Sequence, residues 1–181
     1  MNNEINIQFN ETKEILQKVN ENLAIEYVIW MKNKAKIKFE NKISTFPITS
    51  NYIYWCDLGI NIGSEQNKIR PVLIVKTKKE SSVCTILPLT SERMNDTRWY
   101  HIDLENQNST VLIEQLRNVS KLRIVNPFRM KGKLGKITLN DWKKINFAMK
   151  KYYTMTKWQW KSLKISWLLI FICYTYINKT L

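Results

Sequence analysis

The fold is decided by residues 57–74, DLGINIGSEQNKIRPVLI, which join the end of one apolar run to the start of the next. Gly63 and Asn67 tolerate backbone angles that most residues avoid, so the polar part of this stretch predicts an adaptable loop. Pro71 biases Arg70 towards an extended conformation at the start of the following strand. This would hold the guanidinium at the strand's end, where it can grip a phosphate through two parallel hydrogen bonds.

Short apolar runs continue on both sides of this loop. They are rich in β-branched and aromatic residues and are separated by charged or turn-forming residues. We expect strands at 52–58, 71–77, 83–89, 99–104 and 110–117. Many short strands with little helix between them predict a mainly β fold, an antiparallel barrel or sandwich. A helix is expected after Thr138, whose hydroxyl can cap it.

The first fifty residues have a different pattern. Apolar residues recur at helical spacing and predict one long helix over 11–39, with Asn10 as its cap. We expect its apolar stripe to pack on the parent domain or on a partner helix. Pro47 lies among Ser and Thr, which predicts a linker at 41–50.

Charge is distributed unevenly along the chain. The 181 residues carry a net charge of +14, and residues 51–153 hold twice as many Lys and Arg as Asp and Glu. This excess predicts a polyanionic partner: nucleic acid first, an acidic protein or anionic membrane second. A solvated basic surface without a partner is the alternative. The three cysteines form neither a disulfide framework nor a zinc pattern, and the N-terminus lacks a secretory signal, so the cytoplasm is the expected location.

Three polar sequence blocks, each beside a predicted strand, follow one another over residues 51–153. They are GSEQ at 63–66 with RPV at 70–72, LPLTS at 87–91, and VLIEQLR at 111–117 with KLR at 121–123. A GKL at 132–134 precedes the last predicted helix. Any one block alone is unspecific, but their order and spacing together resemble the MazF/PemK family of type II toxin–antitoxin toxins.

The resemblance implies a small SH3-like antiparallel barrel with a C-terminal helix, acting as a homodimer. Members of the family cut single-stranded RNA, often at a short sequence, without a metal or other cofactor. An antitoxin silences them, so RNA, a small acidic antitoxin and a second copy are the implied partners. The matching positions imply Arg70, Thr90 and Glu65 as catalytic residues. RNA-binding positions are implied at Ser64, Gln66, Lys68, Ser91, Gln115 and Arg117.

The chemistry of such a cleavage uses the substrate's own 2′-hydroxyl as nucleophile. The enzyme must remove its proton, stabilise the charged phosphorane and protonate the leaving oxygen. The last two needs suit a positioned Arg70 and the hydroxyl of Thr90. An arginine stays protonated, since its pKa exceeds ~12, so Arg70 is expected to act as an electrostatic stabiliser. Glu65 is a candidate base or only a loop residue that ligand orders, and the base is left open.

Some of these site residues also have a simpler, purely structural interpretation. Arg70 could pair with Asp57 or Glu114 at the barrel edge, and Thr90 could be a turn hydroxyl. Arg117 could solvate a strand face instead of contacting phosphates. His101 is the only histidine. It lies outside the three blocks, and we expect it to be a surface or packing residue.

Two segments have no counterpart in the family pattern. Residues 1–50 are predicted to be a helical extension that adds to the dimer or antitoxin interface. Residues 154–181 form a Trp-rich, apolar and basic tail whose charge-free run is shorter than the ~20 residues of a membrane span. This tail is predicted to dock on the barrel, to lie at a membrane interface or to have no role.

Two rival functions remain at this stage. One is a non-catalytic toxin on the same barrel that inhibits DNA gyrase. The other is an inactive relative that binds nucleic acid or a membrane.

Overall fold

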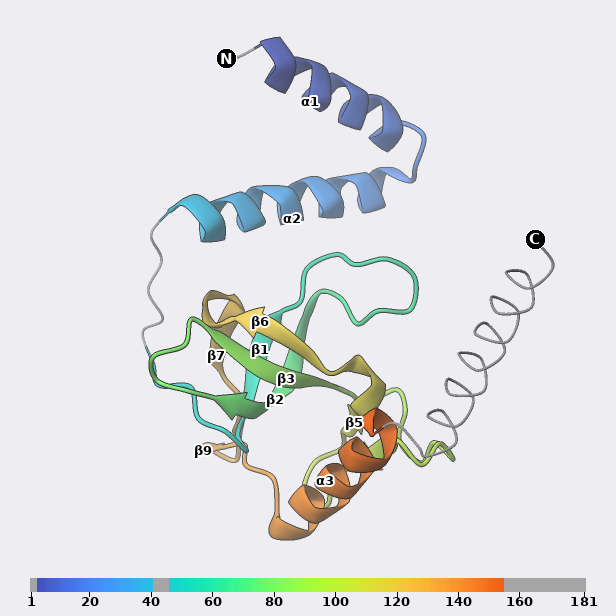
Figure 1. Cartoon of the computed structure of the whole chain (residues 1–181). Helices are drawn as coiled ribbons and strands as arrows, with labels where there is room; N and C mark the ends of the chain where they lie inside the picture. The colour runs from blue at the N-terminus through green and yellow to red at the C-terminus, as the bar shows by residue number, and fades with distance from the viewer. Residues whose placement is uncertain (1–2, 41–45, 155–181) are drawn as a thin grey trace, which may run out of the picture.

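The computed structural model describes residues 3–40 and 46–154, arranged as a helical hairpin above a β domain (Figure 1). The hairpin consists of α1 (Asn3–Leu16) and α2 (Glu21–Phe39), and α3 (Leu139–Tyr153) ends the β domain. The long strands are β1 (Ile53–Asp57), β2 (Ile69–Thr77) and β3 (Val83–Thr90). The short strands are β4 (His101–Asp103), β5 (Thr110–Leu112), β6 (Arg117–Ser120), β7 (Ile124–Pro127), β8 (Arg129–Met130) and β9 (Lys133–Leu134).

The main sheet has the order β4-β5-β3-β2-β1-β7, with every neighbouring pair antiparallel. Strand β6 pairs with the first half of β3, while β5 pairs with its second half. The 3-10 helix η2 (Lys121–Arg123) joins β6 to β7 and so carries the chain from one edge to the other. Strands β7, β1, β2, β3 and β6 curl into the predicted SH3-like barrel.

Two apolar clusters fill the two faces of this sheet, because side chains alternate along each strand. Leu73 and Leu87 belong to the cluster that packs against Ile145 and Ala148 of α3. Their neighbours Val72, Ile74 and Ile86 belong to the cluster inside the barrel, with Tyr54 and Cys56. Each fully buried aliphatic side chain contributes roughly 1.5–3 kcal/mol, so the two clusters stabilise the domain.

The start of α3 confirms the predicted cap. Thr138 Oγ1 accepts from Asp141 N at 3.0 Å, and Asp141 Oδ2 accepts from Thr138 N at 2.9 Å, which is a capping box. Asp141 also accepts from Glu105 N at 3.1 Å, so the cap ties the helix to the segment between β4 and β5. At the other end, Tyr153 Oη donates to Ile113 O at 2.7 Å.

The prediction of one long helix over 11–39 is wrong, because the chain turns at 17–20 and forms two helices. Asn20 caps the second helix, its side chain accepting from Asn22 N at 3.0 Å. An asparagine at this position competes with helix continuation, which the apolar spacing alone did not show. The cap therefore lies ten residues after the predicted Asn10.

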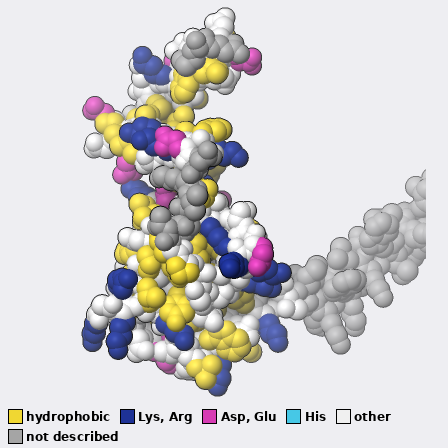
Figure 2. All heavy atoms as spheres, turned by 90° about the vertical axis from the view of Figure 1, so that its left-hand side faces the viewer, with side chains coloured by type: hydrophobic (Ala, Val, Ile, Leu, Met, Phe, Trp, Pro, Cys, Tyr) yellow, Lys and Arg dark blue, Asp and Glu magenta, His cyan; other side chains and the backbone are white. Residues whose placement is uncertain are grey.

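No residue of α1 or α2 is buried. A groove of about 940 Å³ separates the two helices, and it is lined mainly by apolar side chains, among them Phe9, Val19, Ile25 and Val28. Figure 2 shows hydrophobic side chains on the surface of the two helices, next to Lys, Arg, Asp and Glu side chains. Within the two described ranges, no helix combines the length and the apolar character needed to cross a membrane.

The predicted linker is in part a packed segment. Phe46 stacks on Tyr54 with ring centroids 6.1 Å apart, and Thr49 N donates to Tyr54 Oη at 3.0 Å. Residues 41–45 and all but the first residue of the predicted tail at 154–181 lie outside the described residues.

Candidate functional site

The loop between β1 and β2, residues 58–68, is closed at its base by two backbone hydrogen bonds and is here named the site loop. Leu58 N donates to Lys68 O at 2.9 Å, and Lys68 N donates to Gly59 O at 2.6 Å. Gly59 has a φ of +85°, a conformation that favours glycine. We call Leu58, Gly59 and Lys68 the neck of the loop. The predicted residues Ser64, Glu65 and Gln66 lie beyond this neck.

Two residues that the family resemblance assigns to RNA binding hold the backbone of the site loop instead. Gln115 Oε1 accepts from Gln66 N at 3.3 Å, and Gln115 Nε2 donates to Ser64 O at 3.5 Å. Arg117 Nη2 donates to Gln66 O at 2.6 Å. Asn61 Nδ2 donates to the same carbonyl at 2.7 Å. The second half of the loop is thus fixed from η1 (Ile113–Gln115), from β6 and from within.

The side chain of Gln66 points to a binding function. Its Oε1 atom is buried, and no hydrogen-bond donor reaches it from the described part of the chain. A buried amide oxygen without a donor costs about 1–3 kcal/mol. A ligand donor at this point would remove that cost.

Arg70 lies at the start of β2, opposite Cys56 of β1. Its Nε donates to Asn67 O at 3.0 Å, which directs the side chain towards the site loop. Within residues 3–40 and 46–154 it forms no ion pair, so the predicted pairing with Asp57 or Glu114 is absent. The remaining guanidinium donors are therefore not committed to a carboxylate of the described chain.

Arg70 and Thr90 lie at the same end of the β2–β3 pair. The pairing ends at Val72↔Pro88, and each of the two residues lies two positions beyond it, Arg70 before Val72 and Thr90 after Pro88. Thr90 is 4% exposed, and its Oγ1 accepts from Glu92 N at 3.2 Å. Thr90 is thus a turn hydroxyl, as its simpler role predicted. Because the oxygen accepts in this bond, the hydroxyl proton stays available to donate.

Positive charge is concentrated where these strands meet the site loop. The pKa of Arg117 is lowered, mainly because its guanidinium is partly buried. The nearby carboxylate of Glu65 partly offsets this lowering. Arg123 Nη1 donates to Asp57 O at 3.1 Å. Cys56 lies beneath the two arginines, and burial raises the pKa of its thiol to about 12 although both guanidinium charges oppose this. Cys56 is thus a neutral core residue in an electropositive corner.

The other predicted residues are at the surface. Glu65 is exposed in the site loop, and it is the one carboxylate between Leu58 and Ile69. Ser91 is exposed directly after β3. Lys68 is exposed at the neck, where its Nζ lies 3.0 Å from Glu26 Oε1 of α2.

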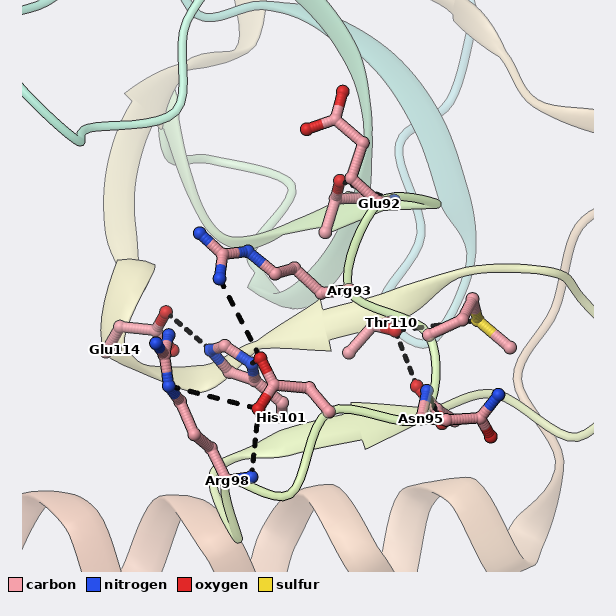
Figure 3. A network of polar contacts seen from close by, with 11 residues as sticks. Glu92, Arg93, Asn95, Arg98, His101, Thr110 and Glu114 are labelled. Atoms are coloured by element: carbon pink, nitrogen blue, oxygen red, sulfur yellow. Dashed lines mark hydrogen bonds and ion pairs between the residues drawn. The ribbon is translucent and has the colours of Figure 1, made fainter.

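His101 forms a buried polar network that the sequence reasoning missed (Figure 3). Its side chain is 1% exposed, and each ring nitrogen lies 2.9 Å from a carboxylate oxygen, Nδ1 from Asp96 and Nε2 from Glu114. With a carboxylate oxygen at each ring nitrogen, the imidazole is held in one orientation between the two acidic side chains. Arg93 and Arg98 reach the same Asp96 carboxylate at 3.8 and 3.9 Å.

This network links two segments around the site. Asp96 belongs to the segment after Thr90, and Glu114 directly precedes Gln115, which holds the site loop. The pKa of Asp96 is lowered, mainly because its carboxylate accepts from the backbone N–H of Arg98. The hydrogen bond with His101 lowers it further. The alternation of Tyr100, Ile102 and Leu104 sets His101 on the other face of β4, and only the folded chain shows which carboxylates it meets there.

Comparison with known proteins identifies the β domain. The family described as "PemK-like, MazF-like toxin of type II toxin-antitoxin system" matches residues 50–153, more than half of the chain. Endoribonuclease EndoA of Bacillus subtilis (strain 168) is 26% identical over 81 residues, which cover 40% of this chain and 70% of that protein.

A solved structure supports the same fold. The crystal structure of MazF (Form-I) from Deinococcus radiodurans superposes with a TM-score of 0.51 at 14% sequence identity. The match covers 61% of this chain and 99% of that one, and at this identity it shows the fold alone. Together with the family match over the three sequence blocks, it leads to one conclusion: the chain belongs to the PemK-like, MazF-like toxins of type II toxin–antitoxin systems.

Proposed function

We propose that this toxin is a sequence-selective endoribonuclease that cleaves single-stranded mRNA in the cytoplasm by attack of the substrate's own 2′-hydroxyl. One observation carries the proposal: Arg70 has no carboxylate partner in the described chain, and it lies at the base of the loop that bears Glu65, at the same end of the β2–β3 pair as Thr90. The relative's name, endoribonuclease EndoA, supports the same class of reaction.

The reaction balances with these groups alone. The 2′-oxygen attacks phosphorus while the bond to the 5′-oxygen breaks, which leaves a 2′,3′-cyclic phosphate and a 5′-hydroxyl. Arg70 stabilises the negative charge of the phosphorane with its uncommitted donors. The Thr90 hydroxyl, whose proton is not used in the turn, donates to the leaving or a non-bridging oxygen. Glu65 is the site-loop carboxylate available to take the 2′-hydroxyl proton.

RNA binding is assigned to the surfaces around this pair. Ser64, Gln66, Lys68 and Ser91 border it, and Gln115 and Arg117 contribute by holding the site loop in place. Arg117 and Arg123 supply positive charge to the same corner.

The partner is proposed to be a small acidic antitoxin that competes with RNA for this basic corner, and the toxin is proposed to act as a homodimer. The family's definition as one half of a toxin–antitoxin pair supports the antitoxin, and the net charge of +14 supports an acidic one.

The test is a cleavage assay on a long single-stranded RNA with excess EDTA, with the fragment ends mapped. Wild type should give discrete cuts ending in cyclic phosphate. Arg70→Ala should lower the rate by about 10²–10³, the usual loss for a removed charge-stabilising donor. Arg129→Ala is the matched control, because Arg129 is exposed on β8 and its side chain donates to Gly132 O, away from the site loop.

Two results would contradict the proposal. If folded wild type leaves RNA intact, a non-catalytic toxin is indicated, and DNA gyrase is the next target to assay. If Arg129→Ala loses as much activity as Arg70→Ala, general charge and not the Arg70–Thr90 pair explains the cleavage.

A further inference from the structure

Helix α2, which lies before the family-matched residues 50–153, contacts the site loop at both sides of its neck. We infer that Trp30 of α2 is a positioning residue that holds this neck, so that the N-terminal extension orders the proposed catalytic loop. Its effect on cleavage rests on the proposed function, whereas its effect on loop order does not.

The first contact is between Trp30 and Gly59. A methyl group at position 59 would lie 2.5 Å from Trp30 Nε1 and 3.4 Å from Arg123 Nη1. The glycine is therefore enclosed between the indole of α2 and the guanidinium that donates to Asp57 O. Figure 1 shows α2 running directly above this loop. So close an approach between two segments needs a residue without a side chain, which Gly59 supplies.

The second contact is on the other side of the neck. Lys68 Nζ lies 3.0 Å from Glu26 Oε1, and the Lys68 backbone N–H donates to Gly59 O. Trp30 and Glu26 are four residues apart, so they share one face of α2. One face of the helix thus reaches Gly59 and Lys68, two of the three residues of the neck.

The side chain of Trp30 is itself held in place. Its ring centroid lies 5.3 Å from that of Tyr27, and Lys34 Nζ lies 4.9 Å from its centroid. Such contacts restrict the indole before any substrate is present. The indole of Trp30 and the carboxylate of Glu26 both lie at the neck, so α2 can order the loop from its base.

Hydrogen–deuterium exchange of peptides covering residues 58–68 tests this in the full chain without RNA. Trp30→Ala should raise exchange at the neck amides roughly tenfold, since local opening governs their protection. Trp30→Phe keeps an aromatic ring and should raise it less. Val28→Ala is the matched control, because Val28 is on the same helix, 51% exposed, and lines the groove towards α1. Unchanged exchange in folded Trp30→Ala overturns the inference.

A charge exchange keeps the test decisive if Trp30→Ala does not fold. Glu26→Lys should raise exchange at the neck by about twofold, because exposed ion pairs are weak. Adding Lys68→Glu should restore protection. If Glu26→Lys changes nothing, or if the double variant exchanges as fast as the single one, α2 does not hold the neck.

The catalytic consequence has its own readout. Because the site loop is less ordered in Trp30→Ala, this variant should lower kcat by roughly tenfold with a smaller change in KM. A displaced loop impairs the alignment of the catalytic groups with the RNA more than it weakens the attraction between the basic surface and the RNA. If exchange at the neck rises but kcat is unchanged, Trp30 holds the neck without contributing to catalysis. If the wild type is inactive and Trp30→Ala still raises exchange at the neck, the proposed function is contradicted, but the role of Trp30 in holding the neck is not.

Discussion

The β domain and the α1–α2 hairpin both contain recurring apolar residues, yet they are stabilised in different ways. In the β domain, most aliphatic residues of β1, β2 and β3 are buried, and Ile74, Ile86 and Leu87 are 0% exposed. In the hairpin, Ile15, Leu23 and Ile25 are 65%, 61% and 49% exposed. The comparison shows that apolar residues at helical spacing are enough to form an amphipathic helix. They become buried in a core only where a second layer of secondary structure packs against them.

The largest expected difference between the regions comes from truncating one isoleucine in each. Ile86→Ala should lower the free energy of unfolding by about 2–5 kcal/mol, because it empties a filled site inside the barrel. Ile25→Ala should change it by no more than about 0.5 kcal/mol, as for exposed positions. Urea unfolding of the full chain, followed by tryptophan fluorescence, measures both.

Two results would contradict this comparison between the β domain and the hairpin. If Ile25→Ala costs as much as Ile86→Ala, the hairpin face is covered in solution, and a protein-concentration series would show whether a second copy covers it. If neither variant loses stability, the buried clusters do not hold the domain together.

The fold was predictable where side-chain pattern and burial agree. Strands at 71–77 and 83–89 correspond to β2 and β3, because β-branched runs between polar turns have no competing interpretation. The predicted strand at 110–117 instead divides into β5, η1 and β6. The chain must pass from one half of β3 to the other there, and only tertiary structure sets that step.

The caps of α2 and α3 give the next largest difference. Thr138→Ala should cost about 1–2 kcal/mol of global stability, because Thr138 belongs to a capping box on a helix packed against the core. Asn20→Ala removes an equivalent side-chain bond to Asn22 N, but α2 buries none of its residues.

For Asn20→Ala we therefore expect less helical circular dichroism and an unchanged global unfolding midpoint. The same midpoint shift for both caps would mean that α2 unfolds together with the barrel, which would tighten the link between the regions.

The site residues, like the strands, could be predicted only in part from the sequence. The position of Arg70 before a buried strand, and the turn hydroxyl of Thr90, follow from local sequence. The loop-holding role of Gln115 and Arg117 does not, because these residues lie about fifty positions from Gln66 and meet it only through the sheet. The carboxylates on both sides of His101 lie only five and thirteen positions away in the sequence, but the chain path that brings both of them to the ring is not visible in the local pattern.

The smallest expected effect is the acid sensitivity of the β domain. Asp96 and Glu105 have pKa values held below their ordinary 3.8 and 4.5, chiefly by the Arg98 backbone N–H for Asp96 and by the Asn140 side chain for Glu105. A carboxyl with a lowered pKa in the folded state binds fewer protons there than in the unfolded chain. Its stabilisation is complete above the ordinary value and is lost as the pH falls through the lowered one.

The unfolding midpoint should therefore fall as the pH drops below about 4. Asp96→Asn should lower stability at neutral pH and reduce this acid-dependent loss, because its amide cannot form the same charged pair with His101 and the nearby arginines. Glu11→Gln on α1, an exposed carboxylate of the hairpin, is the matched control. Thermal unfolding followed between pH 3 and pH 7 compares them. Equal acid profiles for Asp96→Asn and wild type would show that the His101 network does not contribute to the difference between the two regions.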